Sequence, residues 1–322
     1  MNRNWLRALL PLVVVFVLGV VFNGDGAFFE WQTHRALLRE ISVHGILACA
    51  LTLVIIAGGI DLSVGSVLAL AAVTFSWLSM HRGVSSPLAL ALVLVLGALC
   101  GAVSGALVGV ARIQAFIVTL AMMVFARGLA KLISGGQKIS HYFAGPDGHF
   151  VSVEPPALFA LIDRKVFGGQ VSVVTLIFVA CAALSYVVLA RLRVGRYLYA
   201  LGGNWDAARL AGVPVRQVTL LVYAVAGLFS AIAGVCQAAQ ETQGDPETGL
   251  GYELDAIAMV VLGGTSLSGG RGGIGLTLIG ALSLGYLQKI LSLNAYSTEA
   301  RLMLTGVVVI GAVLFQRRAR AT

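Results

Sequence analysis

Apolar runs close to the length of a membrane-spanning helix recur along the whole chain, and they constrain the fold more than any other feature. A helix needs about 20 such residues to cross the hydrocarbon core of a bilayer. The composition agrees, because 58% of the 322 residues are apolar, only 11% are charged, and the mean hydropathy is +0.93. Inside a bilayer every backbone N–H and C=O group must be paired internally, which favours helices. The sequence therefore predicts an all-α polytopic membrane protein, with residues 1–322 forming a single transmembrane domain.

We expect about ten transmembrane helices. Residues 1–22 also resemble a secretory signal, but no clear A-x-A site follows the apolar run, so an uncleaved first span is favoured. With the N-terminus in the cytoplasm, the inner segments hold many arginines and only two acids, Asp61 and Asp206. This asymmetry follows the positive-inside rule and predicts that both termini face the cytoplasm. The expected spans are 8–22, 44–58, 64–80, 87–110, 114–133, 171–190, 217–238, 254–266, 273–291 and 301–316.

A polar cytoplasmic loop, residues 191–216, separates two of these apolar runs and contains the signals of a short helix. Asn204 can cap its start, with Asp206 near the positive end of the helix dipole and Arg209 near the negative end. Gly212 supplies a left-handed residue that ends the helix, and a proline two residues later prevents its continuation. A helix of about two turns is unstable alone in water, so we expect it to dock against another element.

Small residues mark close packing within the bundle. The expected span 87–110 has a glycine at every fourth position, which places four residues without side chains on one helical face. We expect a neighbouring helix to pack there, in preference to a substrate path. Four cysteines lie inside apolar runs, where they are expected to be small buried side chains. These glycines are Gly97, Gly101, Gly105 and Gly109, and the cysteines are Cys49, Cys100, Cys181 and Cys236.

The pattern GGxxLSxG occurs at residues 58–65 and again at 263–270, each time after an apolar run and before another. The chain therefore appears duplicated, and the expected topology places both hairpins on the same side, as in a parallel repeat. Paired glycines break a helix and free backbone groups, so we expect both hairpins to be interior. Asp61 is expected to cap the following helix with Ser63 and Ser66; contact with an ion or substrate is the alternative. The candidate path residues are Gly58, Gly59, Asp61, Ser63, Gly263, Gly264, Ser266 and Ser268.

Two outer segments are predicted to be periplasmic loops. Segment 134–170 contains Gly-Pro-Asp-Gly at 145–148 and a later Pro-Pro pair, which predict a structured loop. Segment 239–253 is acidic and has no positive charge. It either faces a soluble partner or is an ordinary solvated loop.

The motifs of several enzyme classes are missing. The chain has no GxxxxGK[ST] phosphate loop, so we expect no ATP binding by that route and no bound cofactor. Gly270, Gly272 and Gly275 match a dinucleotide fingerprint, but they open a membrane span and follow no soluble strand. The five histidines are dispersed, which supports neither a zinc site nor acyl transfer. The net charge of +8 is explained by the membrane topology, so no nucleic-acid partner is expected.

The helix of the polar loop resembles a family signature. Asp206 begins a DAAxxxG run that is similar to the EAAxxxG signature of permease subunits in bacterial ATP-binding-cassette importers, with Asp in place of Glu. Residues 55–66, 195–213 and 251–272 together resemble the ribose-like sugar permeases of those importers. The resemblance covers nearly the whole chain, including the expected number of spans. It departs most in segment 134–170.

This resemblance implies a function and a set of partners. The chain would be the transmembrane permease for a sugar in the bacterial inner membrane, working with a cytoplasmic ATPase that binds the ATP. A periplasmic sugar-binding protein would deliver the sugar, and a second copy or a similar permease would complete the path. The short helix would insert into a cleft on the ATPase and couple its closure to the membrane spans. Its residues are Asn204, Asp206, Ala207, Ala208, Arg209 and Gly212.

Two alternatives belong to other classes. An ion-coupled secondary transporter would also use broken hairpins and an acid such as Asp61. A structural or assembly protein of the membrane would have no transport path. Dependence of transport on ATP, and co-purification of an ATPase, distinguish these readings. The sugar itself is not specified by the sequence.

Overall fold

The computed structural model describes residues 3–144 and 149–318, and nearly all of the regular structure there is helical. The helices are α1 (Arg3–Val21), α2 (Trp31–Ile56), α3 (Val64–Ser76), α4 (Ser86–Gly109), α5 (Ala115–Ser134), α6 (Ala157–Asp163), α7 (Val173–Arg191), α8 (Arg193–Gly203), α9 (Trp205–Leu210), α10 (Val215–Glu241), α11 (Tyr252–Leu262), α12 (Ile274–Leu293) and α13 (Thr298–Arg318), with the short helical turns η1 (Ala27–Phe29) and η2 (Trp77–His81). The strands are β1 (Ile139–Ser140), β2 (Tyr142–Ala144), β3 (Phe150–Ser152), β4 (Lys165–Val166), β5 (Val171–Ser172) and β6 (Gln243–Gly244).

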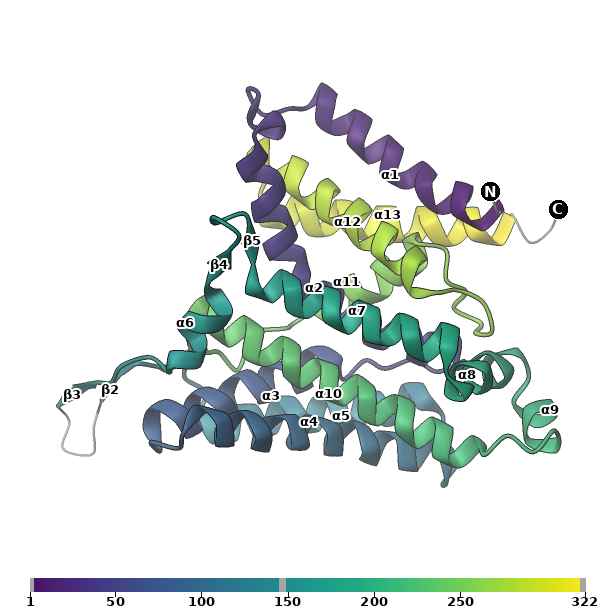
Figure 1. Cartoon of the computed structure of the whole chain (residues 1–322), viewed down its shortest axis with the longest axis horizontal. Helices are drawn as coiled ribbons and strands as arrows, with labels where there is room; N and C mark the ends of the chain where they lie inside the picture. Colours follow the sequence, from purple (N-terminus) through teal and green to yellow (C-terminus); the bar gives the residue numbers. More distant parts are fainter. Residues whose placement is uncertain (1–2, 145–148, 319–322) are drawn as a thin grey trace.

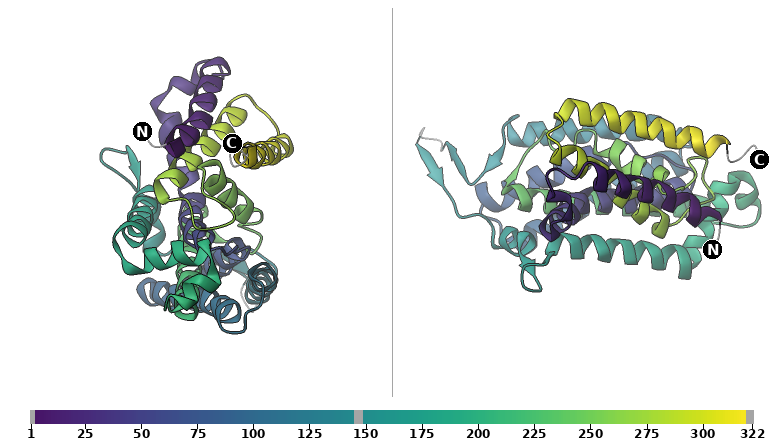
Figure 2. Two further views of the ribbon diagram at one scale, coloured as in Figure 1. Left: turned by 90° about the vertical axis from the view of Figure 1, so that its right-hand side faces the viewer. Right: turned by 90° about the horizontal axis from the view of Figure 1, so that it is seen from above.

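Helices α4, α5, α7, α10 and α13 run roughly along the long axis of the molecule, whereas α2 crosses it obliquely (Figures 1 and 2). Helices α8 and α9 lie at one end together with both chain termini, while α6 and the β2–β3 ribbon lie at the opposite end (Figure 1). Helix α10 packs against α2, α3 and α4, and α2 also packs against α7, α11 and α12. Residues 46–56 of α2 are almost completely buried, so α2 and α10 form the centre of the core.

Seven helices of the described chain are long and apolar enough to cross a membrane, which confirms a polytopic helical protein. The expected number of ten spans stays a prediction. Helix α11 has 11 residues, which at 1.5 Å per residue reaches only about half of a ~30 Å hydrocarbon core. The helix is shorter than the expected span 254–266. The chain before α11 folds back into the bundle, so α11 begins inside the bundle and not at its end.

The glycines of α4 pack directly on α10, as expected from their spacing. A Cβ atom added to Gly101 would lie 2.8 Å from the Tyr223 carbonyl carbon, and one added to Gly105 would lie 2.7 Å from the Leu220 Cα atom. Gly227 of α10 packs on α4 in the same way, because a Cβ atom added to it would lie 2.9 Å from the Gly101 nitrogen. The close approach of the two backbones confirms the predicted helix packing. All four cysteines are free and buried, as predicted.

Three two-stranded antiparallel ribbons lie outside the helices. β4 pairs with β5, and β2 pairs with β3 on either side of residues 145–148, which lie outside the described part of the chain. β1 pairs with β6 in the register Ile139 to Gly244. The described part of segment 134–170 is thus a structured loop, as predicted, and its β1 strand is joined to the chain that follows α10.

Candidate functional site

Helix α9 is a capped helix of six residues at one end of the molecule (Figure 1). The side-chain oxygen of Asn204 accepts a hydrogen bond of 2.9 Å from the Ala207 N–H, and the Asn204 carbonyl accepts one from Ala208. Asp206 lies in the first turn and Arg209 in the last turn. The predicted cap and dipole arrangement is therefore confirmed.

The end of α9 is also built as the sequence predicts. Gly212 has a φ of 83°, in the left-handed region, and its N–H donates to the Arg209 carbonyl. The next N–H, from Val213, donates to the Ala208 carbonyl. Ala208 is buried against the molecule, whereas Leu210 is 89% exposed. The Leu210 side chain therefore points away from the molecule.

Helix α8 supports α9 and connects it to the bundle. Gly195 packs on the end of α7, where its Cβ would lie 2.7 Å from the Leu189 Cα atom. At the other end of α8, a Cβ on Gly202 would lie 2.5 Å from the Gly270 nitrogen and closer still to the Ile56 carbonyl oxygen. The Tyr199 hydroxyl donates to the Gly272 carbonyl at 3.0 Å. Helix α8 therefore rests on the second hairpin and on the end of α2.

The two GGxxLSxG hairpins meet at this position. The Gly270 N–H donates to the Ile56 carbonyl at 2.9 Å. A Cβ on Gly269 would lie 2.9 Å from the Cα atoms of both Gly58 and Gly202. We call these four residues, Gly58, Gly202, Gly269 and Gly270, the glycine junction. It joins α8 to both hairpins through backbone contacts alone.

Asp61 lies at the buried end of the first hairpin, where it is 1% exposed. One of its carboxylate oxygens accepts hydrogen bonds from the Ser63 N–H at 2.8 Å and from the Ser63 hydroxyl at 2.6 Å. The observed arrangement differs from the expected helix cap. Asp61 bonds to Ser63, the residue that precedes α3, and the Ser63 side chain makes no hydrogen bond to the first turn of α3. The Asp61 carboxylate fixes the turn that leads into α3. The Ile60 carbonyl accepts from the Tyr223 hydroxyl at 3.3 Å.

The second hairpin is stabilised by its own backbone. Gly264 has a φ of 98°, and the Ser266 N–H donates to the Arg271 carbonyl at 3.0 Å. Thr265 is fully buried and its hydroxyl accepts from the Gly273 N–H at 3.4 Å. Gly263 packs on α12 and Gly59 on Tyr223, while Ser266 is buried.

The expectation that both hairpins are wholly interior is wrong at their tips. Gly58, Gly264 and Ser268 are exposed, whereas Asp61, Ser63 and Thr265 are buried. The tips lie beside α8 at the end of the molecule. Water can pair the freed backbone groups there, so burial is needed only for the polar residues deeper in the bundle.

The acidic segment after α10 does not lie free in solution. Residues 242–251, which we call the re-entering segment, fold back between α3 and α5. A Cβ on Gly244 would lie 2.7 Å from the Ala72 carbonyl oxygen, and one on Gly249 would lie 3.2 Å from the Gly65 carbonyl carbon. Contact with α3 buries Gly244 and Gly249, so this part is not simply a solvated loop. Glu247 and Leu250 remain exposed, and contact with a soluble partner stays a prediction.

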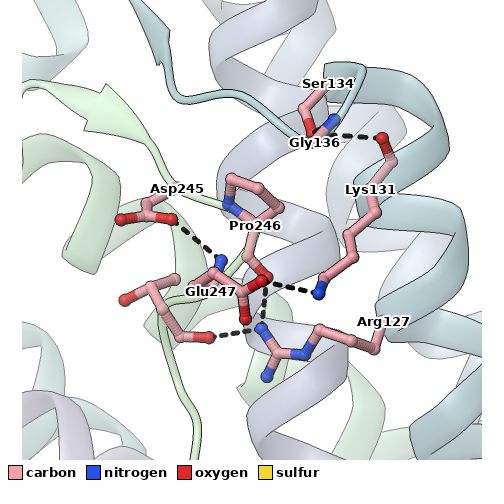
Figure 3. Close-up of polar contacts among 8 residues, drawn as sticks. Arg127, Lys131, Ser134, Gly136, Asp245, Pro246 and Glu247 are labelled. Carbon is pink, nitrogen blue, oxygen red and sulfur yellow. Dashed lines mark hydrogen bonds and ion pairs between the residues drawn. The ribbon is translucent and has the colours of Figure 1, made fainter.

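Basic residues from α5 and the chain that follows it hold the re-entering segment (Figure 3). The Arg127 guanidinium donates to the Pro246 carbonyl and, at 2.7 Å, to the Thr248 carbonyl. Lys131 pairs with Glu247 at 2.6 Å, but both side chains are about half exposed, so this pair contributes little. Lys138 pairs with Asp245 at 3.0 Å, and the hydrogen bond to that carboxylate raises the lysine's pKa. Arg127 is the principal contact.

Two of these features were not among the candidate residues. Arg127 lies well inside the expected span 114–133, with Lys131 one turn further along, and an ionisable residue in that position normally has a defined partner. Gly202 belongs to a Gly-Gly pair just before Asn204, but the sequence does not show that it packs on a hairpin. The structure brings the α9 residues and the hairpin glycines together at one end of the molecule, while Asp61 and Ser63 are buried deeper in the helix bundle.

Comparisons with known proteins agree with this architecture. The family model described as the permease component of branched-chain amino acid transport systems matches residues 34–313. The ribose import permease protein RbsC of Escherichia coli (strain K12) is 39% identical over 319 residues, which cover 98% of this chain and 96% of the relative. RbsC of Bacillus subtilis (strain 168) is 37% identical over 98% of this chain and 94% of its own length. The L-arabinose transport system permease protein AraH of Escherichia coli (strain K12) is 37% identical over 96% of this chain and 89% of the relative.

No solved structure matches the chain. The permease relatives span almost the full length of this chain, including both hairpins and the α8–α9 loop, and they confirm the predicted resemblance. The alternative of an ion-coupled secondary transporter is wrong, and the chain is a transport subunit of the inner membrane that crosses it several times. The chain belongs to the family of permease components of ATP-binding-cassette importers.

Proposed function

We propose that the chain forms the membrane path for a sugar and is driven by a separate cytoplasmic ATPase that docks on α9. The observation that supports this most directly is the connection from α9 to both hairpins. Helix α9 has an exposed face, and α8 rests on the glycine junction. A force applied to α9 would therefore reach both hairpins through backbone contacts. ATP would bind only to the ATPase, with no cofactor on this chain.

The roles of the α9 residues follow from their positions. Asn204 caps the helix, and Gly212 ends it in the left-handed conformation. Ala208 is small and buried, which allows the helix to lie close to its neighbours, whereas Ala207 is on the exposed side. Asp206 and Arg209, both exposed, are available to the ATPase. Leu210 would enter an apolar part of the ATPase surface.

The orientation follows from the charge of the two ends. The α9 end holds the arginines of the 191–216 loop, and positive residues favour the cytoplasmic side. Both termini lie at this end (Figure 1), so we assign them to the cytoplasm. The opposite end, with α6 and the three ribbons, would face the periplasm and receive a sugar-binding protein.

The substrate class is a proposal drawn from the relatives. Two are named ribose import permeases and one an L-arabinose permease, which favours a pentose or a sugar of similar size here. A second permease, either a copy of this chain or a similar one, would complete the path. Val124 and Phe125 of α5 are more than half exposed, so this helix has an apolar face available for lipid or the second permease.

The test uses the purified complex reconstituted in vesicles with the sugar-loaded binding protein. We expect uptake to require ATP inside the ATPase-containing compartment and to be unaffected by dissipating ion gradients. Gly212→Val should abolish stimulation of ATP hydrolysis while the chain still inserts, because a β-branched residue is strained at a positive φ. Asp206→Lys should do the same by reversing a charge at the helix start.

The matched control for the backbone effect is Gly203→Val. Both glycines have open space around the position of a Cβ atom, but only Gly212 has a positive φ. Normal stimulation and uptake in Gly212→Val and Asp206→Lys would show that α9 is an ordinary turn, and the proposed coupling would then be wrong.

A further inference from the structure

A cavity of about 270 Å³ lies beside α9, between the α4–α5 loop and the start of α10. Three arginines line it, each from a different part of the chain: Arg112 from the α4–α5 loop, Arg209 from α9 and Arg216 from α10. Trp205 and Pro214 form part of its apolar wall. The cavity is large enough for a phosphate group with its attached ester carbons.

The charge inside this cavity is entirely positive. No acidic residue lines it, and none of the ion pairs between described residues uses any of the three arginines. Guanidinium groups gathered in one place repel one another unless an anion is bound between them. Arginine also matches the geometry of phosphate, because its planar N–H groups bind two oxygens at once. All three arginines are exposed, so water solvates them when no ligand is bound, and an oxyanion of phosphate type is the ligand that matches their charge and geometry.

One of the three arginines is oriented by an aromatic contact. The Arg112 guanidinium carbon lies 5.0 Å from the centre of the Trp205 ring, a cation–π arrangement that orients the side chain. The backbone at Arg112 has a φ of 57°, which turns the chain sharply after α4. Arg216 lies in the first turn of α10, a long and well-packed helix. The cavity is thus built from ordered elements that converge from separate parts of the sequence.

The surroundings indicate which phosphate compound fits. Apolar side chains next to the arginines are exposed: Val110 by 54%, Ile113 by 41%, and Leu220, one turn beyond Arg216, by 38%. Val110 and Ile113 lie in the loop that directly follows α4, and Leu220 lies in α10. Both helices are apolar enough to cross a membrane, so the acyl chains of a lipid would cover these side chains. A tryptophan at this depth is typical of the interface between headgroups and hydrocarbon. A free phosphate ion would leave this apolar surface without a partner.

We propose that this cavity binds the headgroup phosphate of an anionic phospholipid from the leaflet on the α9 side. The acyl chains lie against the exposed apolar ends of α4 and α10. The lipid holds the α4–α5 loop, α9 and the start of α10 together through one anion. The proposal concerns a site on this chain. Arg209 is the one lining arginine that the proposed ATPase contact also uses, so the test relies on Arg112 and Arg216.

The experiment measures lipid binding to the full-length chain in a neutral detergent, with any co-purifying subunits retained. Phosphatidylglycerol, phosphatidylcholine or inorganic phosphate is titrated into the protein. Native mass spectrometry counts the bound molecules, and the rise in melting temperature gives an independent measure of binding. The variants are Arg112→Gln and Arg216→Gln, and the matched control is Arg193→Gln, an exposed arginine of α8 outside the cavity. Each cavity variant should weaken phosphatidylglycerol binding about fivefold, since one arginine near an anionic lipid contributes about 1 kcal/mol.

Wild-type protein should bind phosphatidylglycerol in preference to phosphatidylcholine, and Arg193→Gln should match it. Equal binding by the wild-type protein and both cavity variants would overturn the proposal. Binding of inorganic phosphate with no preference between the two lipids would assign the cavity to a soluble anion and overturn the lipid assignment. A weakening in Arg193→Gln as large as in the cavity variants would show only general surface attraction and would also overturn it.

Discussion

Replacing Gly202 with alanine should separate α9 from the hairpins while leaving every transmembrane helix intact. The added methyl group would lie 2.5 Å from the Gly270 nitrogen and closer still to the Ile56 carbonyl oxygen. Carbon atoms do not approach backbone atoms within 3.0 Å, so the backbones must move apart by about 1 Å. Both neighbours are main-chain atoms, and no rotamer change can relieve the contact.

The magnitude follows from these contacts. The 2.9 Å hydrogen bond from Gly270 to Ile56 would be stretched or lost, at a cost of about 1 kcal/mol. Overpacking at a backbone contact adds about 1 to 3 kcal/mol. We therefore expect the variant to be destabilised by roughly 2 to 4 kcal/mol before any relaxation. Part of this strain will be relieved by displacement of α8, which also moves α9.

The assay compares ATP hydrolysis and sugar uptake in vesicles containing the complete complex, with and without loaded binding protein. Gly202→Ala should retain basal hydrolysis but lose most of the stimulation and uptake. Gly203→Ala is the matched control, because the adjacent glycine in the same helix has no atom within 4 Å of its Cβ position and no positive φ. Stimulation by the binding protein that is equal in both variants would refute a mechanical role of the glycine junction.

Three further substitutions test other contacts. Gly101→Leu should prevent α4 from packing on α10 and reduce the yield of folded protein, measured by size-exclusion chromatography, whereas Gly128→Leu, which points into open space, should not. Asp61→Asn keeps an oxygen that accepts from the following turn, so uptake should fall only modestly; complete loss would show that the negative charge itself is required. Arg127→Gln should leave two partly buried carbonyls of the re-entering segment without this donor, at about 1 to 3 kcal/mol, and faster backbone hydrogen exchange over residues 243–249 should report release of the segment.

The sequence predicts the local structure well wherever one residue determines it. The Asn204 cap, the left-handed Gly212 and the α4 glycine face each follow from the properties of a single residue type at a known spacing. Hydropathy likewise locates most of the helices, because every segment that crosses lipid must be apolar and must pair its own backbone groups. The family resemblance extends these local features to the function of the whole chain.

The sequence does not predict where irregular segments fold back. The acidic residues of the re-entering segment are typical of an exposed loop, but their partners, such as Lys138, lie about a hundred residues away. Helix α11 is short for the same reason, since the chain before it already occupies part of the membrane depth. Such tertiary contacts leave no periodic signal in the sequence, and the cations Arg127 and Lys131 within an apolar run are the sign of a polar partner there.

The glycine junction explains why so short a helix can transmit a movement. Helix α9 has six residues and no independent stability, so it moves with α8 as one body. Side chains at an interface can absorb a displacement by changing rotamer, whereas backbones in direct contact cannot. At Gly202 the backbone of α8 touches both hairpins at once, and the first hairpin leads through Asp61 into α3. Because α3 packs on the re-entering segment, a displacement that begins at α9 has a continuous path of close backbone contacts toward the opposite end of the molecule.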